Sequence, residues 1–253
     1  MKLKSNRFLK AIRAGEPQIG LWVSMASPFC AEVVAGADFD WVIIDMEHAH
    51  TDVATASTQM QAFAPYHTTA MVRPAWNDAV MIKRVLDAGA PGLLIPMVQN
   101  AAEAEAAVRA CRYPPRGIRG VSGIQRGNNF GRVSDYFERV EEETAILLQI
   151  ETQAALDCAE EIAAVDGCDG IFFGPADIAA DLGRLPDAMH KDVWDAILPV
   201  AKRLIAKGVP VGTLVLDPVF AKQLVEDGFT FVACGTDVAL LRAGSDALRD
   251  AMR

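Results

Sequence analysis

Short apolar segments alternate with amphipathic segments from one end of the chain to the other. Most apolar segments carry hydrophobic residues at consecutive positions, which is typical of strands buried on both faces of a parallel sheet. We expect eight such strands, at Ile19–Val23, Trp41–Asp45, Ala70–Arg73, Leu93–Met97, Ile146–Ile150, Gly170–Phe173, Val211–Val215 and Phe229–Ala233.

The segments between these strands have the spacing of helices with one apolar face. Several have a glycine just beyond their end, such as Gly89 and Gly228, and glycine adopts the left-handed conformation of a helix end without steric cost. Phe8, Leu9 and Ile12 indicate a further short helix before the first strand. The predicted helices after the strands are Pro28–Gly36, Val53–Phe63, Asp78–Ala88, Ala101–Arg112, Thr152–Ala164, Lys191–Lys207, Pro218–Asp227 and Asp237–Met252.

Eight strands, each followed by a helix, within 253 residues predict a (β/α)8 TIM barrel. The alternative is an open doubly wound sheet, which usually has fewer strands and a glycine-rich phosphate turn after the first one. Here the first strand continues into LWVSMASP, which contains no GxGxxG motif. No change of composition marks a second domain, so we expect a single domain over residues 1–253.

The segment Tyr113–Tyr136 interrupts the regular alternation. It is rich in glycine and arginine, and it is longer than an ordinary connection. Connections of more than about 12–15 residues are commonly functional or disordered. We therefore consider three roles for this segment: an active-site loop, a subunit-contact loop, or a solvated excursion of the chain.

The balance of charge restricts the partners. There are 24 Lys and Arg residues against 33 Asp and Glu residues, a formal net charge of −9. This balance does not suggest the basic face that nucleic acid needs. A negative field also repels small anions, so a carboxylate substrate would require cationic groups placed locally. No window approaches the roughly 18–20 apolar residues that span a membrane, so we expect no membrane partner.

The cysteines indicate a reducing compartment. All are widely scattered and none forms a CxxC pair, which argues against a disulfide framework or a zinc site. The basic opening segment 1–17 is interrupted by polar residues and lacks the apolar stretch of a secretory signal. We therefore expect a cytoplasmic protein. The five cysteines are Cys30, Cys111, Cys158, Cys168 and Cys234.

In a TIM barrel the active site lies at the carboxyl ends of the strands. Polar residues follow four of the predicted strands at this point, and an apolar strand would hold each group rigidly. These residues are Asp45, Glu47, His48 and His50 after the second strand, Arg73 after the third, Gln149 and Glu151 after the fifth, and Gly174–Asp177 after the sixth.

Glu151 and Asp177 would come from adjacent strands. Two carboxylates with open positions suit a hard divalent cation such as Mg²⁺ or Mn²⁺, which also binds water and substrate oxygens. The alternative is that either residue caps a helix, and Asp177 stands just before IAAD, a plausible helix start.

Asp45 and His48 are spaced so that the carboxylate could orient the imidazole as a base near neutral pH, although a histidine is often only a structural hydrogen-bonding group. His50 is as well explained by simple exposure. Arg73 supplies local positive charge for an oxyanion or a carboxylate, unless it serves a structural pair across the barrel mouth. None of the eight lysines follows a predicted strand, which disfavours a Schiff-base mechanism.

These residues carry a resemblance to a known family. Seven segments, in order along nearly the whole chain, together resemble the HpcH/HpaI aldolases, and more narrowly the metal-dependent class II pyruvate aldolases. They are GLW (20–22), DFDWVIIDMEHAH (38–50), VRP (72–74), DAGAPGLLIPMV (87–98), RYPPRGIRGV (112–121), QIET (149–152) and FFGPADIAADLG (172–183). The resemblance implies a TIM barrel that assembles as a hexamer, a trimer of dimers in which the last helix is exchanged between neighbours.

The resemblance also implies a role for each site residue. Glu151 and Asp177 would bind Mg²⁺, Mn²⁺ or Co²⁺, and His48 with Asp45 would form the base dyad. Arg73 would stabilise the enolate. The other implied contacts are Gln149 near the metal and substrate, the backbone of Gly174, Pro175, Ala176 and Asp177 at the pyruvyl carboxylate, Leu214 at the substrate, and Asp87 supporting a neighbouring subunit's histidine.

The chain departs from the family pattern at two positions that bear on which aldehyde the enzyme would accept. Relatives usually have glycine at the position of Met46 and proline near His50, so the loop that carries His48 could differ in shape and in acceptor preference.

The resemblance thus implies reversible aldol cleavage of a 4-hydroxy-2-oxo acid to pyruvate, or a related 2-oxo acid, and an aldehyde, through an enolate held by a divalent metal. One alternative is an acyl-CoA carbon–carbon lyase of a related barrel family. That enzyme would need a basic groove for adenine, for which Arg112–Arg132 is the only candidate. A second alternative is a catalytically idle barrel that binds metal or 2-oxo acids. The sequence does not identify the aldehyde.

Overall fold

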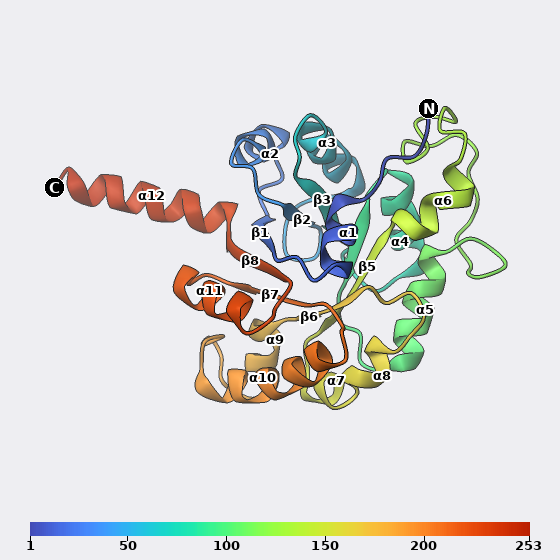
Figure 1. Cartoon of the computed structure of the whole chain (residues 1–253). Helices are drawn as coiled ribbons and strands as arrows, with labels where there is room; N and C mark the ends of the chain where they lie inside the picture. Colours follow the sequence, from blue (N-terminus) through green and yellow to red (C-terminus); the bar gives the residue numbers. More distant parts are fainter.

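The computed structural model describes residues 1–253. Eight parallel strands follow one another in sequence order around a closed barrel, and the last strand pairs with the first. Helices surround this barrel on the outside (Figure 1). The predicted single-domain (β/α)8 TIM barrel is confirmed.

Every predicted strand is present, and four of the eight have all their residues buried, as expected where both faces of a parallel sheet are covered. The largest shift is in the last strand, because Phe229 belongs to the preceding turn, where its amide donates to Leu224. The strands are β1 (Gln18–Val23), β2 (Trp41–Asp45), β3 (Thr69–Arg73), β4 (Gly92–Ile95), β5 (Ala145–Ile150), β6 (Gly170–Phe173), β7 (Val211–Val215) and β8 (Phe231–Thr236).

The helices depart from the expectation at three places. The predicted helix Thr152–Ala164 divides in two at Cys158, and two further helices, α6 and α9, were not predicted. The helices are α1 (Arg7–Arg13), α2 (Pro28–Ala35), α3 (Val53–Phe63), α4 (Ala79–Asp87), α5 (Ala101–Cys111), α6 (Tyr136–Glu143), α7 (Gln153–Asp157), α8 (Ala159–Ala163), α9 (Pro175–Asp181), α10 (Lys191–Ala206), α11 (Pro218–Glu226) and α12 (Asp237–Ala251).

Side-chain caps fix where several helices begin. Ser27, Asp52, Asp78 and Asn100 each accept a hydrogen bond from a backbone N–H in the first turn of the helix that follows. Such a cap satisfies one of the amides that have no partner within the helix. These four βα connections therefore enter their helices at defined residues.

The core has two layers. The larger apolar cluster fills the space between the strands and the surrounding helices, and a smaller cluster fills the inside of the barrel. Phe8 of α1 belongs to the inner cluster, where its ring lies 5.6 Å from that of Trp41 and 5.8 Å from that of Phe231. Because Trp41 and Phe231 begin their strands, α1 closes the amino end of the barrel and leaves the carboxyl end for a site.

The segment between α5 and α6 lies at the amino end of the barrel, against the end of α4. Arg119 donates to Asp87 at 2.7 Å, and Gly127 donates to the Asp87 carbonyl at 3.0 Å. Arg119, Gln125 and Asn128 are buried, so the segment is folded onto the protein and is not a solvated excursion. It also does not cover the strand ends of its own barrel.

The last helix, α12, projects away from the barrel (Figure 1). Asp237, at its start, is the only buried residue among its 15. Leucines 240, 241 and 248 are all exposed on it. No helix of the protein is both long enough and apolar enough to cross a membrane.

Candidate active site

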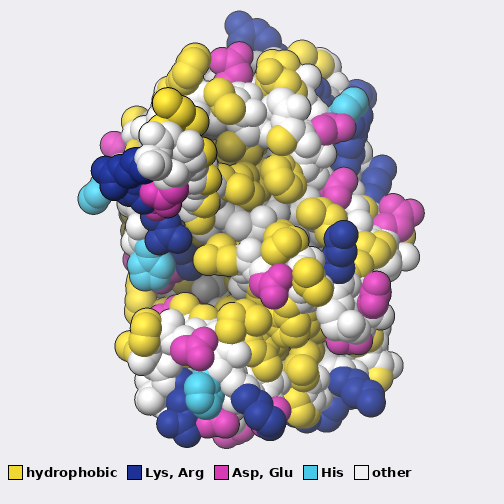
Figure 2. Space-filling model, turned by 90° about the vertical axis from the view of Figure 1, so that its left-hand side faces the viewer, with side chains coloured by type: hydrophobic (Ala, Val, Ile, Leu, Met, Phe, Trp, Pro, Cys, Tyr) yellow, Lys and Arg dark blue, Asp and Glu magenta, His cyan; other side chains and the backbone are white.

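A cavity of about 900 Å³ opens at the carboxyl ends of the strands. Figure 2 views the molecule from the side on which α12 projects, and hydrophobic side chains gather around a hollow in the middle of that face. Most of the site residues expected from the sequence line this cavity, whereas Asp45 and Glu151 are buried beside it and Asp87 lies elsewhere. Those that line it are His48, Arg73, Gln149, Gly174, Pro175, Ala176, Asp177 and Leu214.

Arg73 and Asp45 form a buried, two-pronged ion pair. The two residues are register partners at the ends of β3 and β2. The Arg73 Nε and Nη2 atoms donate to the two Asp45 oxygens at 2.9 and 2.8 Å. Burial acts to raise the pKa of Asp45, but the hydrogen bonds and charge of Arg73 outweigh it and hold that pKa below its usual value. The guanidinium group is thus fixed in place and lies over the Trp22 ring, 5.0 Å from its centroid.

The expected contact between Asp45 and the His48 imidazole is wrong for this structure. Asp45 accepts instead from the backbone amide of His48, at 3.4 Å, and from that of Glu47, at 3.0 Å. The His48 side chain is 64% exposed, and its Nε2 atom lies 4.0 Å from Glu47. The physical reason is that Arg73 offers Asp45 two charge-assisted hydrogen bonds, which together outweigh a single one to an imidazole.

Glu47 is a site residue to which the sequence assigned no role. Its carboxylate lies 2.9 Å from the Arg73 Nη1 atom, so Arg73 is held from two sides. Burial raises the pKa of Glu47, and the charge of Arg73 opposes that rise. The available signal was its position two residues after a strand end, between Asp45 and His48.

Glu151 follows β5 directly and is buried. The backbone amide of Met97 donates to one of its oxygens at 2.8 Å. Burial raises the pKa of Glu151 to about 8, and the neighbouring Asp177 carboxylate adds to the rise. No cationic side chain compensates a negative charge at Glu151, since Arg73 is occupied by Asp45 and Glu47.

Gly174 permits the close approach of these groups. It links β6 to α9, and a Cβ atom at this position would lie 3.0 Å from Glu151 Oε2 and 3.1 Å from Gln149 Nε2. Any larger residue would therefore push these side chains out of place. Asp177 lies in the first turn of α9 and does not cap it with its side chain, so the helix-cap alternative is wrong for Asp177.

The donor set fits a hard divalent cation. Two carboxylates, Glu151 and Asp177, converge without a counter-charge, and the buried Gln149 Oε1 atom beside them has no hydrogen-bond partner. No group of three or more His, Cys, Asp or Glu side chains able to hold a metal ion is present in the chain. A cation here would therefore have two protein carboxylates and would complete its coordination with water and substrate oxygens.

Asp87 does not reach the cavity of its own chain. It ends α4, and α4 runs back from the carboxyl end of β3 to the start of β4. Asp87 thus lies at the amino end of the barrel, where Arg119 binds one of its oxygens. Asp87 therefore takes no part in the cavity of its own chain.

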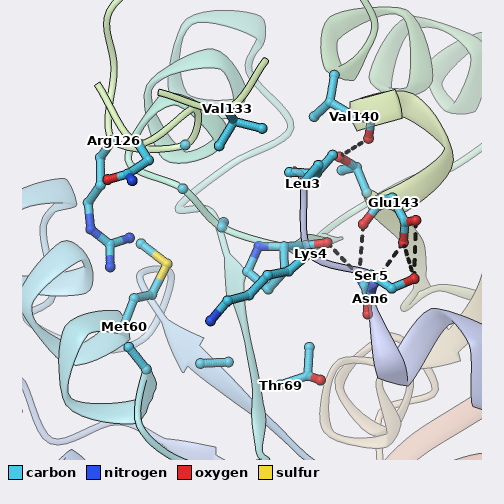
Figure 3. Close-up of a pocket in the computed structure, with 18 of the residues that line it drawn as sticks. Leu3, Lys4, Ser5, Asn6, Met60, Thr69, Arg126, Val133, Val140 and Glu143 are labelled. Carbon is cyan, nitrogen blue, oxygen red and sulfur yellow. Dashed lines mark hydrogen bonds between the residues drawn. The ribbon is translucent and has the colours of Figure 1, made fainter. Parts of the chain in front are cut away.

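A second cavity, of about 770 Å³, also lies at the amino end. Figure 3 shows Lys4 and Arg126 extending toward it from different parts of the wall, with Met60 below. Its one glutamate, Glu143, accepts hydrogen bonds from Ser5 and from the Asn6 amide. This cavity contains no carboxylate pair comparable to Glu151 and Asp177.

The arginines between 112 and 132 do not form a groove for an acyl-CoA at the strand ends. They lie at the amino end of the barrel, and the first three are paired with acids. Arg112 binds Asp166, Arg116 binds Glu141 and Asp166, and Arg119 binds Asp87. The acyl-CoA alternative therefore loses the one feature on which it depended.

Comparison with known sequences identifies the family. The sequence model of the HpcH/HpaI aldolase/citrate lyase family matches residues 18–243, and the chain belongs to this family. The resemblance inferred from the seven sequence segments is thereby confirmed.

Individual relatives are similar over nearly the whole chain. A pyruvate aldolase of Rhizobium etli is 50% identical over 98% of each chain. A 4-hydroxy-2-oxo-heptane-1,7-dioate aldolase of Klebsiella pneumoniae is 48% identical over 96% of this chain and 92% of its own length. The crystal structure of a HpcH/HpaI aldolase/citrate lyase family protein from Burkholderia cenocepacia superposes with a TM-score of 0.94, at 37% identity, over 98% of this chain and 100% of that one.

Proposed function

We propose that this protein is an aldolase that reversibly cleaves 4-hydroxy-2-oxo acids to pyruvate, or a related 2-oxo acid, and an aldehyde. The observation that carries the proposal is the convergence of Arg73, Gln149, Glu151 and Asp177 at one cavity in the mouth of the barrel. The names of the Rhizobium and Klebsiella relatives support the same reaction.

Glu151 and Asp177 would hold a divalent cation, Mg²⁺, Mn²⁺ or Co²⁺, with Gln149 beside it. When bound, such an ion supplies Lewis-acid polarisation of the 2-oxo acid. The backbone amides at the start of α9, from Gly174 through Pro175 and Ala176 to Asp177, would orient the pyruvyl carboxylate, because first-turn amides lack partners within the helix.

His48 is the proposed base. In the cleavage direction it removes the proton of the 4-hydroxyl group, the C3–C4 bond breaks, and the aldehyde leaves. The electron pair of that bond remains on the pyruvate enolate, and Arg73 stabilises its negative charge. A proton returned to C3 gives pyruvate. Asp45 and Glu47 fix the Arg73 guanidinium in the position that this role requires. Leu214 would contact the substrate from β7.

We further propose a homo-hexamer in the cytoplasm, in which α12 is exchanged between subunits and Asp87 supports His48 of a neighbour. The exposure of nearly all of α12 supports the exchange. The position of Asp87 at the amino end of its own barrel is consistent with a role in another subunit's site. All five cysteines are unpaired, which supports a reducing compartment.

The test is release of pyruvate from a panel of 4-hydroxy-2-oxo acids, with and without a chelator. We expect cleavage that EDTA abolishes and that Mn²⁺, Co²⁺ or Mg²⁺ restores, because two carboxylates hold an ion in an exchangeable way. Full activity in verified metal-free protein would contradict the metal role. No cleavage of any compound would favour a catalytically idle binding protein.

A further inference from the structure

The cavity at the amino end of the barrel has no part in the proposed reaction. Four stretches of the chain form its wall, within residues 1–7, 60–70, 86–91 and 126–144. Its volume of about 770 Å³ lies within the range of small-molecule sites, about 300–1,000 Å³. Apolar side chains, among them Met60, Phe63 and Val133, form part of the wall. The size and the lining suit a small organic molecule.

The charged groups of this wall are mainly cationic, although the chain as a whole has 24 Lys and Arg residues against 33 Asp and Glu residues. The single acid, Glu143, already forms an ion pair with Arg139 and accepts hydrogen bonds from Ser5 and from the Asn6 amide. The cavity therefore has a local excess of positive charge. The Lys and Arg residues that line it are Lys2, Lys4, Arg7 and Arg126.

Most of this positive charge is not compensated within the chain. Of the four cations only Lys2 has an acid near it, Asp135 at 3.8 Å. The Lys4 side chain makes no ion pair, and Arg126 donates one hydrogen bond, to the Ala88 carbonyl at 2.7 Å. Burial lowers the pKa of Arg126, and no acid opposes that change. Figure 3 shows Lys4 and Arg126 pointing into the cavity from different walls, so both are placed to bind one anion.

A buried hydroxyl group also lacks a partner in this wall. Thr68 lies in the turn between α3 and β3 and is only 6% exposed, and its Oγ1 atom has no hydrogen-bond partner. A buried polar group of this kind costs free energy unless a water molecule or a ligand satisfies it. The hydroxyl is thus a further hydrogen-bond donor available to a bound molecule.

We propose that the amino-end cavity binds a small organic anion, with a carboxylate or phosphate group attached to an apolar body. The planar guanidinium group of Arg126 and the ammonium group of Lys4 would bind the anionic group, and Met60 and Phe63 would contact the body. The inference goes beyond the proposed aldolase function and does not depend on it, because none of these four residues lines the cavity at the barrel mouth.

Calorimetric titration with three probes of similar size provides the test. Phenylacetate carries a carboxylate, phenyl phosphate carries a phosphate, and 2-phenylethanol is uncharged. The full-length protein is used in its native assembly, so any part of the cavity that a neighbouring subunit covers is covered in the experiment as well. We expect at least one anion to bind with a Kd of about 1 mM or tighter, and the alcohol to bind about tenfold more weakly or not at all. The tighter of the two anions identifies the anionic group.

Four variants locate the binding site. Lys4→Gln and Arg126→Gln should each raise the Kd of the anion about fivefold, and added salt should reduce this difference. Lys4 is exposed and makes no side-chain contact that the fold needs, so its variant should remain folded. Lys222→Gln, the same change at an exposed position of α11 outside the cavity, is the matched control and should leave the Kd unaltered. Arg73→Ala, at the barrel mouth, should leave it unaltered too.

Two results would overturn the inference. One is failure of either anion to bind more tightly than the alcohol. The other is binding that Arg73→Ala abolishes and that Lys4→Gln and Arg126→Gln leave unchanged, because the anion would then occupy the barrel mouth. Neither result bears on the aldolase function, which is tested separately by release of pyruvate.

Discussion

At the scale of single residues, the central feature is an arginine whose orientation is fixed before substrate binds. Arg73 is held by a two-pronged contact with Asp45, a second carboxylate at Glu47, and the face of Trp22. Such preorganised positive charge stabilises a developing oxyanion without having to reorganise during the reaction. The His48 side chain, in contrast, is 64% exposed at the cavity wall.

The roles of His48 and Arg73 can be separated with two reactions. His48→Ala should lower the aldol rate by about 10²–10⁴-fold, the usual range for a positioned base. Decarboxylation of oxaloacetate forms the same enolate without a base, so this variant should keep much more of that activity. Arg73→Ala should lose both activities. Equal loss of both activities in the His48 variant would show that His48 binds substrate or organises the site and does not transfer the proton.

Asp45→Asn should impair both activities as well, because Arg73 would lose its bidentate partner. The change also removes one of the two carboxylates that compensate the buried Arg73, so the free energy of unfolding should fall by up to about 3 kcal/mol. Urea denaturation measures this loss. Asp166→Asn, which removes an exposed partner of Arg112, is the matched control and should change stability far less. A loss for Asp45→Asn no larger than that of the control would contradict a structural role for the pair.

The candidate residues were largely predictable from the sequence, because strand ends of a barrel converge, but their pairing was not. The sequence placed Asp45 and Arg73 at the ends of adjacent strands, which are register partners in the structure. The sequence did not determine which side chain would donate hydrogen bonds to Asp45, since that depends on how Arg73 and His48 are placed around it in the folded structure. It also left Glu47 without a role, because its value as a second partner of Arg73 follows only from side-chain geometry.

At the scale of secondary-structure elements, the turn from β6 into α9 brings the proposed metal site together. Gly174 ends this turn with φ −95° and ψ 86°, backbone angles that alanine also adopts. Backbone conformation therefore does not explain why this residue is glycine. It is required by the closeness of Glu151 and Gln149, whose atoms lie 3.0–3.1 Å from the position of an added Cβ.

Gly174→Ala should therefore weaken the proposed cation site while leaving the fold in place. The new methyl group would displace the Glu151 carboxylate by a few tenths of an ångström, and a metal site requires closely fixed ligands. We expect Mn²⁺ affinity, measured by calorimetry, to fall about tenfold or more, as for other changes that disturb ligand orientation. Gly123→Ala, at a position with nothing within 4 Å, is the control. Unchanged affinity in the Gly174 variant would place the ion elsewhere.

The elements that the sequence predicted best are the buried strands. Their consecutive apolar residues are typical of a strand that is covered on both faces. The helix α6 escaped prediction because it is only eight residues long, consists mostly of charged residues and buries only Tyr136 and Val140. The predicted helix through Cys158 shows the opposite case, because its apolar pattern continues without a breaker while the backbone divides into α7 and α8. The hydrophobic pattern of the sequence indicates which residues are buried. It does not determine where a helix is interrupted, because that depends on tertiary packing.

At the scale of the whole molecule, the two ends of the barrel differ in structure: the amino end is closed and the carboxyl end holds the cavity. The amino end is closed by α1 and by the folded segment between α5 and α6, whose buried Arg119 joins Asp87 to Tyr136. The carboxyl end carries the cavity and the projecting helix α12. Stability and chemistry can therefore change independently, as is general for TIM barrels. Exposed leucines also lie at the carboxyl end, on α12 and beside the cavity.

Substitutions on the exposed helix α12 can test the proposed assembly of subunits. Leu241 and Leu248 lie seven residues apart and so on one face of the helix, and they are 57% and 68% exposed in the chain. If a second subunit buries this face, each leucine contributes about 1.5–3 kcal/mol to association. Alanine preserves helix propensity, so the double change Leu241→Ala with Leu248→Ala should act on assembly and not on the helix itself. We expect the dissociation constant, measured by sedimentation velocity, to rise by about 100-fold or more.

The control for this experiment is Asp246→Ala, an exposed polar position on the same helix, which should leave assembly unchanged. Thermal unfolding of the dissociated double variant should resemble that of the dissociated wild type, because neither leucine is buried within its own chain. If α12 is exchanged and Asp87 completes a neighbour's site, dissociation should also lower the aldol rate in parallel with the loss of assembly. A wild-type protein that is monomeric at micromolar concentration and fully active would show that each barrel works alone, and the exchange would have to be abandoned.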